Sequence, residues 1–259
     1  MFNMVNLGNI MSKGRSIFLA YDQGMEHGPK DFNDRNVDPK YIMSIAEKGR
    51  FSGIIFQKGV AEKYYRGSVP LVMKLNGKTN LVKGDPLSTQ LCSVREAVKL
   101  GAKAVGYTIY IGSVHEQKML KEFGSIEEEA HAKGLPVIAW MYPRGKAIKN
   151  DTSRDVLAYA ARVGLELGAD IIKMKYNGNP GDLKWIVKSA GKTKVVIAGG
   201  LKKDEKKLIR DTYDIMKSGA CGLAIGRNIW QSESPLKITK ALKKVIFHGA
   251  KPKEAMKEL

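Results

Sequence analysis

Eight short apolar segments recur along the chain, and most are followed by a segment with the apolar spacing of a helix. They are rich in Val, Ile and Ala and are bounded by Gly or Pro, which is typical of parallel strands buried on both faces. The segments are residues 17–22, 52–57, 70–76, 103–109, 135–142, 169–175, 194–200 and 221–226. Strands alternating with helices in this number predict an α/β fold, a single (β/α)8 TIM barrel, rather than an open doubly wound sheet.

Helix start and stop signals fill the gaps between these segments. Residues 93–101, 153–168 and 204–219 each open on Ser or Asp and end on Gly, as capped helices do. No Pro/Gly/Ser-rich linker divides the chain, and 259 residues is an ordinary length for one barrel. We therefore expect residues 1–259 to form a single (β/α)8 barrel domain.

The composition limits the partners of the chain. The net charge is +18, but the lysines are dispersed and no nucleic-acid motif accompanies them, so we expect solvated faces and no nucleic-acid partner. No apolar run approaches the roughly 18 residues of a membrane helix, so no membrane partner is expected. The only cysteines, Cys92 and Cys221, match no metal motif and indicate a reduced, cytoplasmic protein.

Two lysines at the end of the sixth apolar segment suggest covalent chemistry. Lys173 and Lys175 lie in GADIIKMKYNG and, by strand alternation, point to the same side. Mutual repulsion and desolvation would lower the pKa of one amine, and a neutral amine attacks carbonyls as a Schiff-base lysine. The alternative is that both lysines reach solvent at the strand end. In either case the active site of a barrel lies at the carboxyl ends of its strands.

Aromatic and cationic residues follow the fifth segment in WMYPRG. Alternation places Trp140 and Tyr142 on one face of this strand, towards the barrel mouth, with Arg144 next to them. Tyr142 can transfer protons if neighbouring cations lower its pKa, and Lys173, Lys175 and Arg144 are the candidate cations. The alternative is an aromatic side chain packed with its hydroxyl on a backbone partner.

Glycine motifs after the seventh and eighth segments match the usual phosphate site of a barrel. Gly199 and Gly200 let the backbone approach a phosphate, as does Gly226, and Arg227 adds a charge-assisted contact. The alternative is that these glycines only make tight turns. Both motifs together predict a phosphorylated ligand.

Two further loops carry polar side chains. In YDQGMEHGPKDF, Asp22 can hydrogen-bond substrate hydroxyls and His27 is a further substrate contact, and no third ligand for a metal is evident. Residues 74–86 follow the third segment, and Lys74 in this stretch either holds a second phosphate or belongs to a mobile solvated loop.

Taken together, seven segments resemble those of the archaeal-type class I fructose-1,6-bisphosphate aldolases. They are AYDQGMEHGP, KLNGKTNL, GYTIYIGS, WMYPRG, GADIIKMKY, IAGG and IGRNIWQ, in this order over nearly the whole chain. The resemblance implies a (β/α)8 barrel, a Schiff base on Lys173 without a metal or other cofactor, and proton transfer by Tyr142. It also implies that Trp140 and Asp22 line the substrate, that the glycine motifs bind phosphate, and that the chain forms a homo-oligomer, often a decamer in this family.

Two positions depart from the family pattern. An additional acidic residue is expected after the lysine strand, where this chain offers only Asp182, and Ala198 stands where Ser often precedes the glycine pair. One alternative is a 2-amino-3,7-dideoxy-D-threo-hept-6-ulosonate synthase-like aldolase of aromatic biosynthesis, although Trp140 and the Glu26-His27 pair favour the fructose-bisphosphate enzyme. The other is a non-catalytic phosphate- or RNA-binding barrel.

Overall fold

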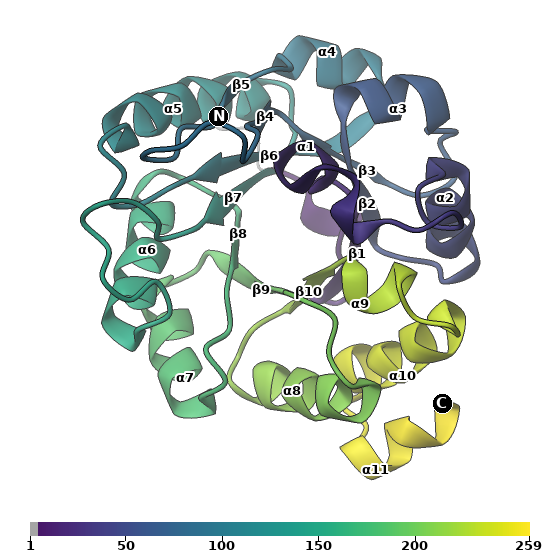
Figure 1. Ribbon diagram of the computed structural model, residues 1–259. Helices are drawn as coiled ribbons and strands as arrows, with labels where there is room; N and C mark the ends of the chain where they lie inside the picture. Colours follow the sequence, from purple (N-terminus) through teal and green to yellow (C-terminus); the bar gives the residue numbers. More distant parts are fainter. Residues whose placement is uncertain (1–4) are drawn as a thin grey trace.

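Eight parallel strands form a closed barrel in the computed structural model, which describes residues 5–259 (Figure 1). Around the barrel the strands follow the order β1-β10-β9-β8-β7-β6-β3-β2. Their bounds are Ser16–Ala20 (β1), Gly53–Gln57 (β2), Leu71–Lys74 (β3), Ala102–Ile109 (β6), Val137–Met141 (β7), Ile171–Met174 (β8), Lys194–Ala198 (β9) and Gly222–Ile225 (β10). The predicted (β/α)8 barrel is therefore confirmed.

Helices surround the ring of strands, and α1 lies over its mouth in Figure 1. The bounds are Gly24–His27 (α1), Pro39–Lys48 (α2), Lys58–Tyr64 (α3), Val94–Lys99 (α4), Glu116–Ala132 (α5), Arg154–Glu166 (α6), Pro180–Ser189 (α7), Glu205–Lys217 (α8), Arg227–Trp230 (α9), Pro235–His248 (α10) and Pro252–Ala255 (α11). The expected caps hold for two of the three predicted helices, since Ser93 forms a capping box with Glu96 and the Asp204 side chain accepts from the amide of Lys207. Ser153 precedes α6 without a side-chain cap hydrogen bond.

Apolar side chains pack in two layers. One large cluster lies between the strands and the outer helices, and a second fills the inside of the barrel. Phe18, Ile55, Val72, Ile138 and Ile171 belong to the inner cluster and are almost completely buried. The barrel interior is thus a packed core, which supports the side chains at the carboxyl ends of the strands rigidly.

Several strands end earlier than the sequence predicts. β1 ends at Ala20, so Asp22 lies in the loop beyond it, and β8 ends at Met174, so Lys175 follows the strand. The loop after β3 is more ordered than a solvated loop, because Asn76–Gly77 (β4) pairs antiparallel with Thr89–Gln90 (β5). Asp22 and Lys175 therefore lie on loop segments immediately beyond the strands, whereas Trp140 and Lys173 lie within β7 and β8.

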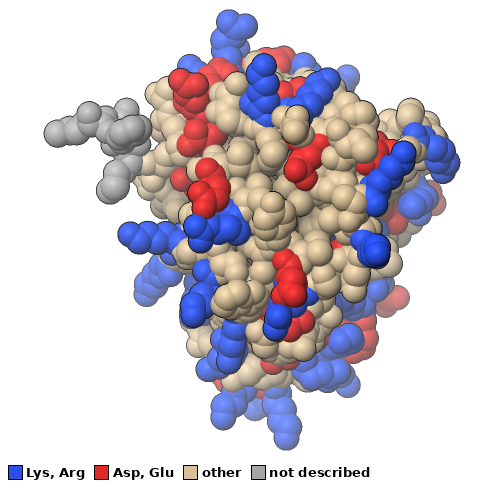
Figure 2. Space-filling view, turned by 90° about the vertical axis from the view of Figure 1, so that its left-hand side faces the viewer, with Lys and Arg blue, Asp and Glu red and all other residues tan. Residues whose placement is uncertain are grey.

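Charged side chains are spread over the face of the molecule seen in Figure 2, with Asp and Glu between Lys and Arg. On this face the basic residues do not gather into one patch, as the dispersed lysines of the sequence indicate. Among residues 5–259, no helix has both the length and the apolar character needed to cross a bilayer.

Candidate active site

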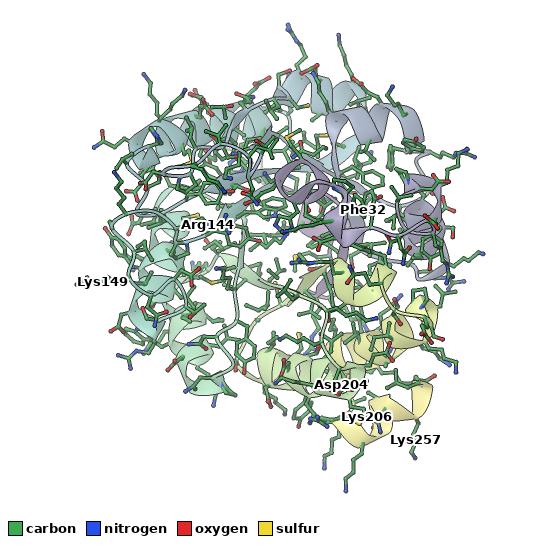
Figure 3. All side chains as sticks on the ribbon, in the orientation of Figure 1. Phe32, Arg144, Lys149, Asp204, Lys206 and Lys257 are labelled. Atoms are coloured by element: carbon green, nitrogen blue, oxygen red, sulfur yellow. The ribbon has the colours of Figure 1, made fainter. Side chains whose placement is uncertain are left out.

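A cavity opens at the carboxyl ends of the strands, where the loops converge. It is lined by eleven of the side chains or glycines that the sequence singles out: Asp22, His27, Trp140, Tyr142, Arg144, Lys173, Lys175, Gly199, Gly200, Gly226 and Arg227. Figure 3 shows Arg144 inside the ring of helices, whereas Lys149 of the same loop lies at its edge. The structure thus brings the predicted residues together, while their individual roles stay predictions.

Lys173 is buried on β8, with 5% of its surface exposed. Its register partner on β7 is Trp140, and Nζ of Lys173 lies 4.9 Å from the centroid of the Trp140 ring. Burial lowers the pKa of Lys173, against the opposing effect of Asp22 and Glu26, which favour the charged form. A buried lysine with a lowered pKa is the amine that a Schiff-base reaction requires.

Lys175 differs from the expectation that it repels Lys173. It forms an ion pair with Asp151, from the loop before α6, and its side chain is about one-third exposed. Burial is the main cause of the lowered pKa of Lys173, and Lys175 is not among the charges that influence it. The reason is the position of Lys175 beyond the end of β8, where its ammonium reaches a carboxylate of its own.

Tyr142 also differs from its predicted state. Burial raises the pKa of Tyr142 well above its ordinary value, and Asp22, Tyr110 and Glu26 add to this effect. Arg144 opposes the rise but does not overcome it. The phenol of Tyr142 is therefore held in its protonated form, contrary to the prediction that neighbouring cations lower its pKa.

Asn228, a buried residue of α9, connects the loop after β9, which contains Gly199 and Gly200, to the loop after β10, which contains Gly226. The sequence analysis did not identify Asn228. Its Nδ2 donates to the carbonyl oxygens of Gly199 at 3.0 Å and Leu201 at 2.9 Å, and its Oδ1 accepts from the amide of Lys203 at 2.8 Å. The amide of Gly199 donates to the carbonyl of Ala224, so Gly199 contributes space rather than a free donor. Asn228 thereby fixes the distance between the loops after β9 and β10.

A carboxylate holds two of the predicted ligand-binding side chains in place. Asp31 contacts Nδ1 of His27 at 2.9 Å and the guanidinium of Arg227 at 3.3 Å. Although its partial burial favours the neutral acid, the hydrogen bond from His27 and the charge of Arg227 keep the pKa of Asp31 below its ordinary value. The loop after β1 and helix α9 are thus connected at the edge of the cavity.

Arg144 is oriented by two residues from other elements. Its guanidinium donates to Glu26 at 2.7 Å and lies 5.2 Å from the centroid of the Tyr110 ring. The Tyr110 hydroxyl in turn lies 3.4 Å from Glu26. Arg144 is thus a fixed cation at the side of the cavity. Its partners come from α1, which contains Glu26, and from the segment after β6, which contains Tyr110.

Lys74 also lines the cavity, although the sequence analysis assigned it to a polar loop. It is the last residue of β3, is 4% exposed, and lines the same cavity as Lys173. The signal was available, because Lys74 lies between two apolar residues, Met73 and Leu75, as Lys173 does within its own strand. Asp182, the candidate for an additional acid, does not line this cavity and accepts a hydrogen bond from Asn177 at 2.8 Å.

The molecule thus belongs to the (β/α)8-barrel proteins, and it carries a buried lysine amine at the mouth of its barrel. The chain is a member of the DeoC/LacD aldolase family, since the family's sequence model matches residues 16–232. Within that family it is similar to class 1 fructose-bisphosphate aldolases, and the protein of Thermoproteus tenax is 49% identical over 247 residues, 94% of each chain.

Two further comparisons give a similar result. The fructose-bisphosphate aldolase/6-deoxy-5-ketofructose 1-phosphate synthase of Methanocaldococcus jannaschii is 37% identical over 265 residues, which cover 94% of this chain and 85% of that protein. A solved archaeal fructose-1,6-bisphosphate aldolase, with its catalytic Lys bound to the carbinolamine intermediate of the substrate, superposes with a TM-score of 0.90 at 48% identity. That alignment covers 93% of this chain and 98% of the other.

Proposed function

We propose that the protein is a class I fructose-1,6-bisphosphate aldolase, which cleaves its substrate reversibly to dihydroxyacetone phosphate and glyceraldehyde 3-phosphate. The observation that carries the proposal is the buried amine of Lys173 in a cavity bordered by glycine loops and Arg227. The similarity to class 1 fructose-bisphosphate aldolases over 94% of the chain supports the same conclusion and favours it over the heptulosonate synthase-like and non-catalytic alternatives.

The first half of the reaction forms the Schiff base. Neutral Lys173 attacks the C2 carbonyl of the open-chain ketose, and the resulting carbinolamine loses water to give a protonated imine. This iminium is the electron sink of the mechanism, so the Lewis acidity of a metal is not needed at this step. The amine is suited to the attack because burial lowers the pKa of Lys173.

The second half breaks the C3–C4 bond. Asp22 takes the proton of the C4 hydroxyl, the bonding electrons move to the iminium nitrogen, and glyceraldehyde 3-phosphate leaves. Tyr142 then protonates C3 of the enamine, and water hydrolyses the imine to release dihydroxyacetone phosphate and free Lys173. The division of roles follows from charge: Tyr142 keeps its proton because burial raises the pKa of this phenol, which leaves Asp22 as the base.

Contacts at the edge of the cavity suit the rest of the substrate. The glycine loops and Arg227 bind one phosphate, whereas Arg144 binds at the other side. The buried Nε1 of Trp140 has no hydrogen-bond partner within residues 5–259, and a substrate hydroxyl supplies the missing acceptor. Lys175 and His27 border the same space, each held by a carboxylate, Asp151 and Asp31 respectively.

An assay of cleavage with excess chelator tests this function. Purified protein is incubated with fructose 1,6-bisphosphate, and glyceraldehyde 3-phosphate is measured by coupled oxidation. We expect turnover with chelator present and no turnover by Lys173→Ala, whereas Lys118→Ala, on the exposed face of α5, retains the parent rate. Full activity of Lys173→Ala, or activity that chelator abolishes, would contradict the proposal.

The protein is also expected to act as a homo-oligomer in the cytoplasm. Two large aromatic side chains support a contact between copies, because Tyr159 on α6 is 66% exposed and Trp185 on the adjacent α7 is 48% exposed. Light scattering after gel filtration measures the oligomeric state directly. A mass equal to the 28.6 kDa of one chain would contradict this part of the proposal.

A further inference from the structure

A second cavity opens at the amino ends of the strands, at the end of the barrel opposite to the candidate active site. Its walls come from the segments that precede β1, β2 and β3 and from the end of α10. Four cationic side chains, Lys13, Arg15, Arg50 and Lys243, line it together with the imidazole of His248. The function proposed above uses none of these residues.

Acidic side chains do not compensate the charge of this cavity. Within residues 5–259, no Asp or Glu lines it, and none lines the adjoining cavity along α10, which shares Arg50 and Lys243 with it. Two other lysines of α10, Lys240 and Lys244, are paired with the same carboxylate, Glu258. The cations of the cavity at the amino ends therefore form an uncompensated positive site that attracts anions.

Lys13 occupies a backbone position that favours asparagine or glycine. Among residues 5–259, Lys13 and Arg50 are the only non-glycine residues with a positive φ, at 49° and 48°. Lys13 and Gly14 form a two-residue turn, because the main chains of Ser12 and Arg15 exchange hydrogen bonds of 2.9 and 3.0 Å. Turns with a positive φ at both central residues prefer Asn-Gly, so the lysine is present at a cost in backbone energy.

Arg50 takes the place of the glycine that ends many helices. Its amide donates to the carbonyl of Glu47 at 3.0 Å, and the amide of Phe51 donates to the carbonyl of Ala46 at 3.0 Å. These two bonds are the Schellman pattern at the end of α2, in which the residue at the position of Arg50 is left-handed and usually glycine. A cation thus stands at a second position where glycine would relieve strain.

Neutral main-chain oxygens orient two further cations of the cavity. Nζ of Lys243 donates to the carbonyls of Gly49 at 3.0 Å and Arg50 at 2.9 Å, which also fixes the turn that carries Arg50. The guanidinium of Arg15 donates to the carbonyl of Ile246. Burial lowers the pKa of Lys243, and the charge of Arg50 adds to this effect. The cations are therefore held close together without a carboxylate between them.

Backbone strain and charge point to the same ligand chemistry. Both strained positions, Lys13 and Arg50, hold cations, and both line one cavity without acidic residues. Strained residues cluster at functional sites, and several Arg and Lys side chains in a concave site match the charge and geometry of phosphate groups. The cavity has a volume of about 750 Å³, which suits a small molecule with more than one phosphate group.

We propose that the cavity at the amino ends of the strands binds a small anion that carries two or more phosphate groups, held by Lys13, Arg15, Arg50 and Lys243. The site is separate from the cavity that contains Lys173, so the proposal does not depend on the function proposed for that cavity. Because the bound anion offsets the repulsion among the four cations, it stabilises the folded protein.

Calorimetry with inorganic tripolyphosphate tests the proposal. The parent protein, Arg50→Gly and Lys13→Asn are titrated at one constant ionic strength. We expect each variant to bind ~10- to 100-fold more weakly than the parent, as the loss of a hydrogen bond between charged groups predicts. Because Gly and Asn suit the left-handed backbone, neither variant should unfold at a lower temperature than the parent without ligand. Weaker binding in a protein of equal or higher stability cannot come from misfolding.

Two further variants exclude other places of binding. Lys118→Ala removes one positive charge from the exposed face of α5, as Arg50→Gly does at the cavity, and should bind like the parent. Arg227→Met alters the cavity of Lys173 and should retain the binding that depends on Arg50. Parent-like binding in Arg50→Gly, equal weakening in Lys118→Ala, or loss of all binding in Arg227→Met would overturn the proposal.

Competition with a single-stranded oligonucleotide distinguishes a small ligand from a nucleic acid. We expect the oligonucleotide to leave the tripolyphosphate titration of the parent unchanged at the same concentration of phosphate groups. Displacement of tripolyphosphate that is lost in Arg50→Gly would overturn the assignment to a small anion and indicate a nucleic-acid surface.

Discussion

Trp140 fits inside the barrel because residue 106 is a glycine. A Cβ placed on Gly106 would lie 1.7 Å from Cζ3 and 2.0 Å from Cη2 of the Trp140 ring, distances that no side chain can occupy. Gly106 is on β6, next to the β7 strand that carries Trp140, and it is the register partner of Lys74 on β3. One missing side chain thus admits the ring to which both buried lysines are adjacent.

Gly106→Ala tests this relationship. The added methyl forces the Trp140 ring out of its place, so we expect a loss of about 1–3 kcal/mol in the free energy of unfolding, as overpacked cores show, together with reduced cleavage activity. Chemical denaturation and the coupled assay measure the two effects. The matched control is Gly124→Ala in α5, where an added Cβ meets nothing within 4 Å and the helix should gain stability. Equal stability of the two variants would contradict the packing argument.

Tyr142→Phe tests the proton donor. Removal of a general acid typically slows the step it serves by ~100- to 10,000-fold, and the imine is still formed because Lys173 is intact. We therefore expect slow turnover with an enamine or imine adduct that accumulates and is trapped by borohydride in larger amounts than in the parent. Parent-like turnover in single-turnover kinetics would show that another group delivers the proton.

Asn228→Ala tests the connection between the phosphate loops. Loss of the side chain leaves the carbonyls of Gly199 and Leu201 without their donor, which is expected to cost about 1–3 kcal/mol. Because the loops then separate, the KM for dihydroxyacetone phosphate in the condensation direction should rise more than that for dihydroxyacetone, which lacks the phosphate. A uniform change for both substrates would indicate a general defect instead.

Lys74→Met has a predicted effect on stability. Burial lowers the pKa of Lys74 from 10.5 to about 8, so below about pH 8 the folded state carries a buried charge that the unfolded chain keeps in water. Nζ of Lys74 donates to the carbonyl and Oδ1 of Asn76, and these acceptors keep other donors, since the Asn76 carbonyl also bonds Gln57 and its Oδ1 bonds the amide of Thr108. We expect the variant to be more stable than the parent by about 1–3 kcal/mol at neutral pH.

The sign of the pH dependence follows from the same shift. Between about pH 8 and about pH 10.5 the unfolded parent binds more protons at this position than the folded parent, so the stability of the parent rises with pH. The advantage of Lys74→Met should therefore shrink over this window and vanish above it. Urea denaturation of both proteins at several pH values measures the difference, and an advantage that is independent of pH would contradict the buried charge.

The barrel and the location of its site could be predicted because both follow from local patterns. Each buried strand is a continuous apolar run, and parallel strands in a barrel end at the same rim, which brings distant segments such as Asp22 and Lys173 to one cavity. The same reasoning, applied to the run that ends in Lys74, would have placed this lysine in the cavity.

What could not be predicted depends on partners remote in sequence. The charge of Lys175 is compensated by Asp151, and the proton of Tyr142 is retained because the folded barrel excludes water from the phenol. The role of Gly106 depends on the direction of a ring from the neighbouring strand. Side-chain direction and burial arise only from the assembled barrel, so a pattern along one strand gives the place of a residue but not its protonation state.

The nucleophile is identified most directly by trapping. Protein incubated with dihydroxyacetone phosphate is reduced with borohydride, digested and mapped by mass spectrometry, and the account predicts one modified lysine, Lys173. Modification of Lys74 or Lys175 would move the reactive amine to another side chain of the same cavity and contradict the assignment of Lys173. A protein that forms no adduct, beside a control aldolase that does, would contradict the Schiff-base mechanism altogether.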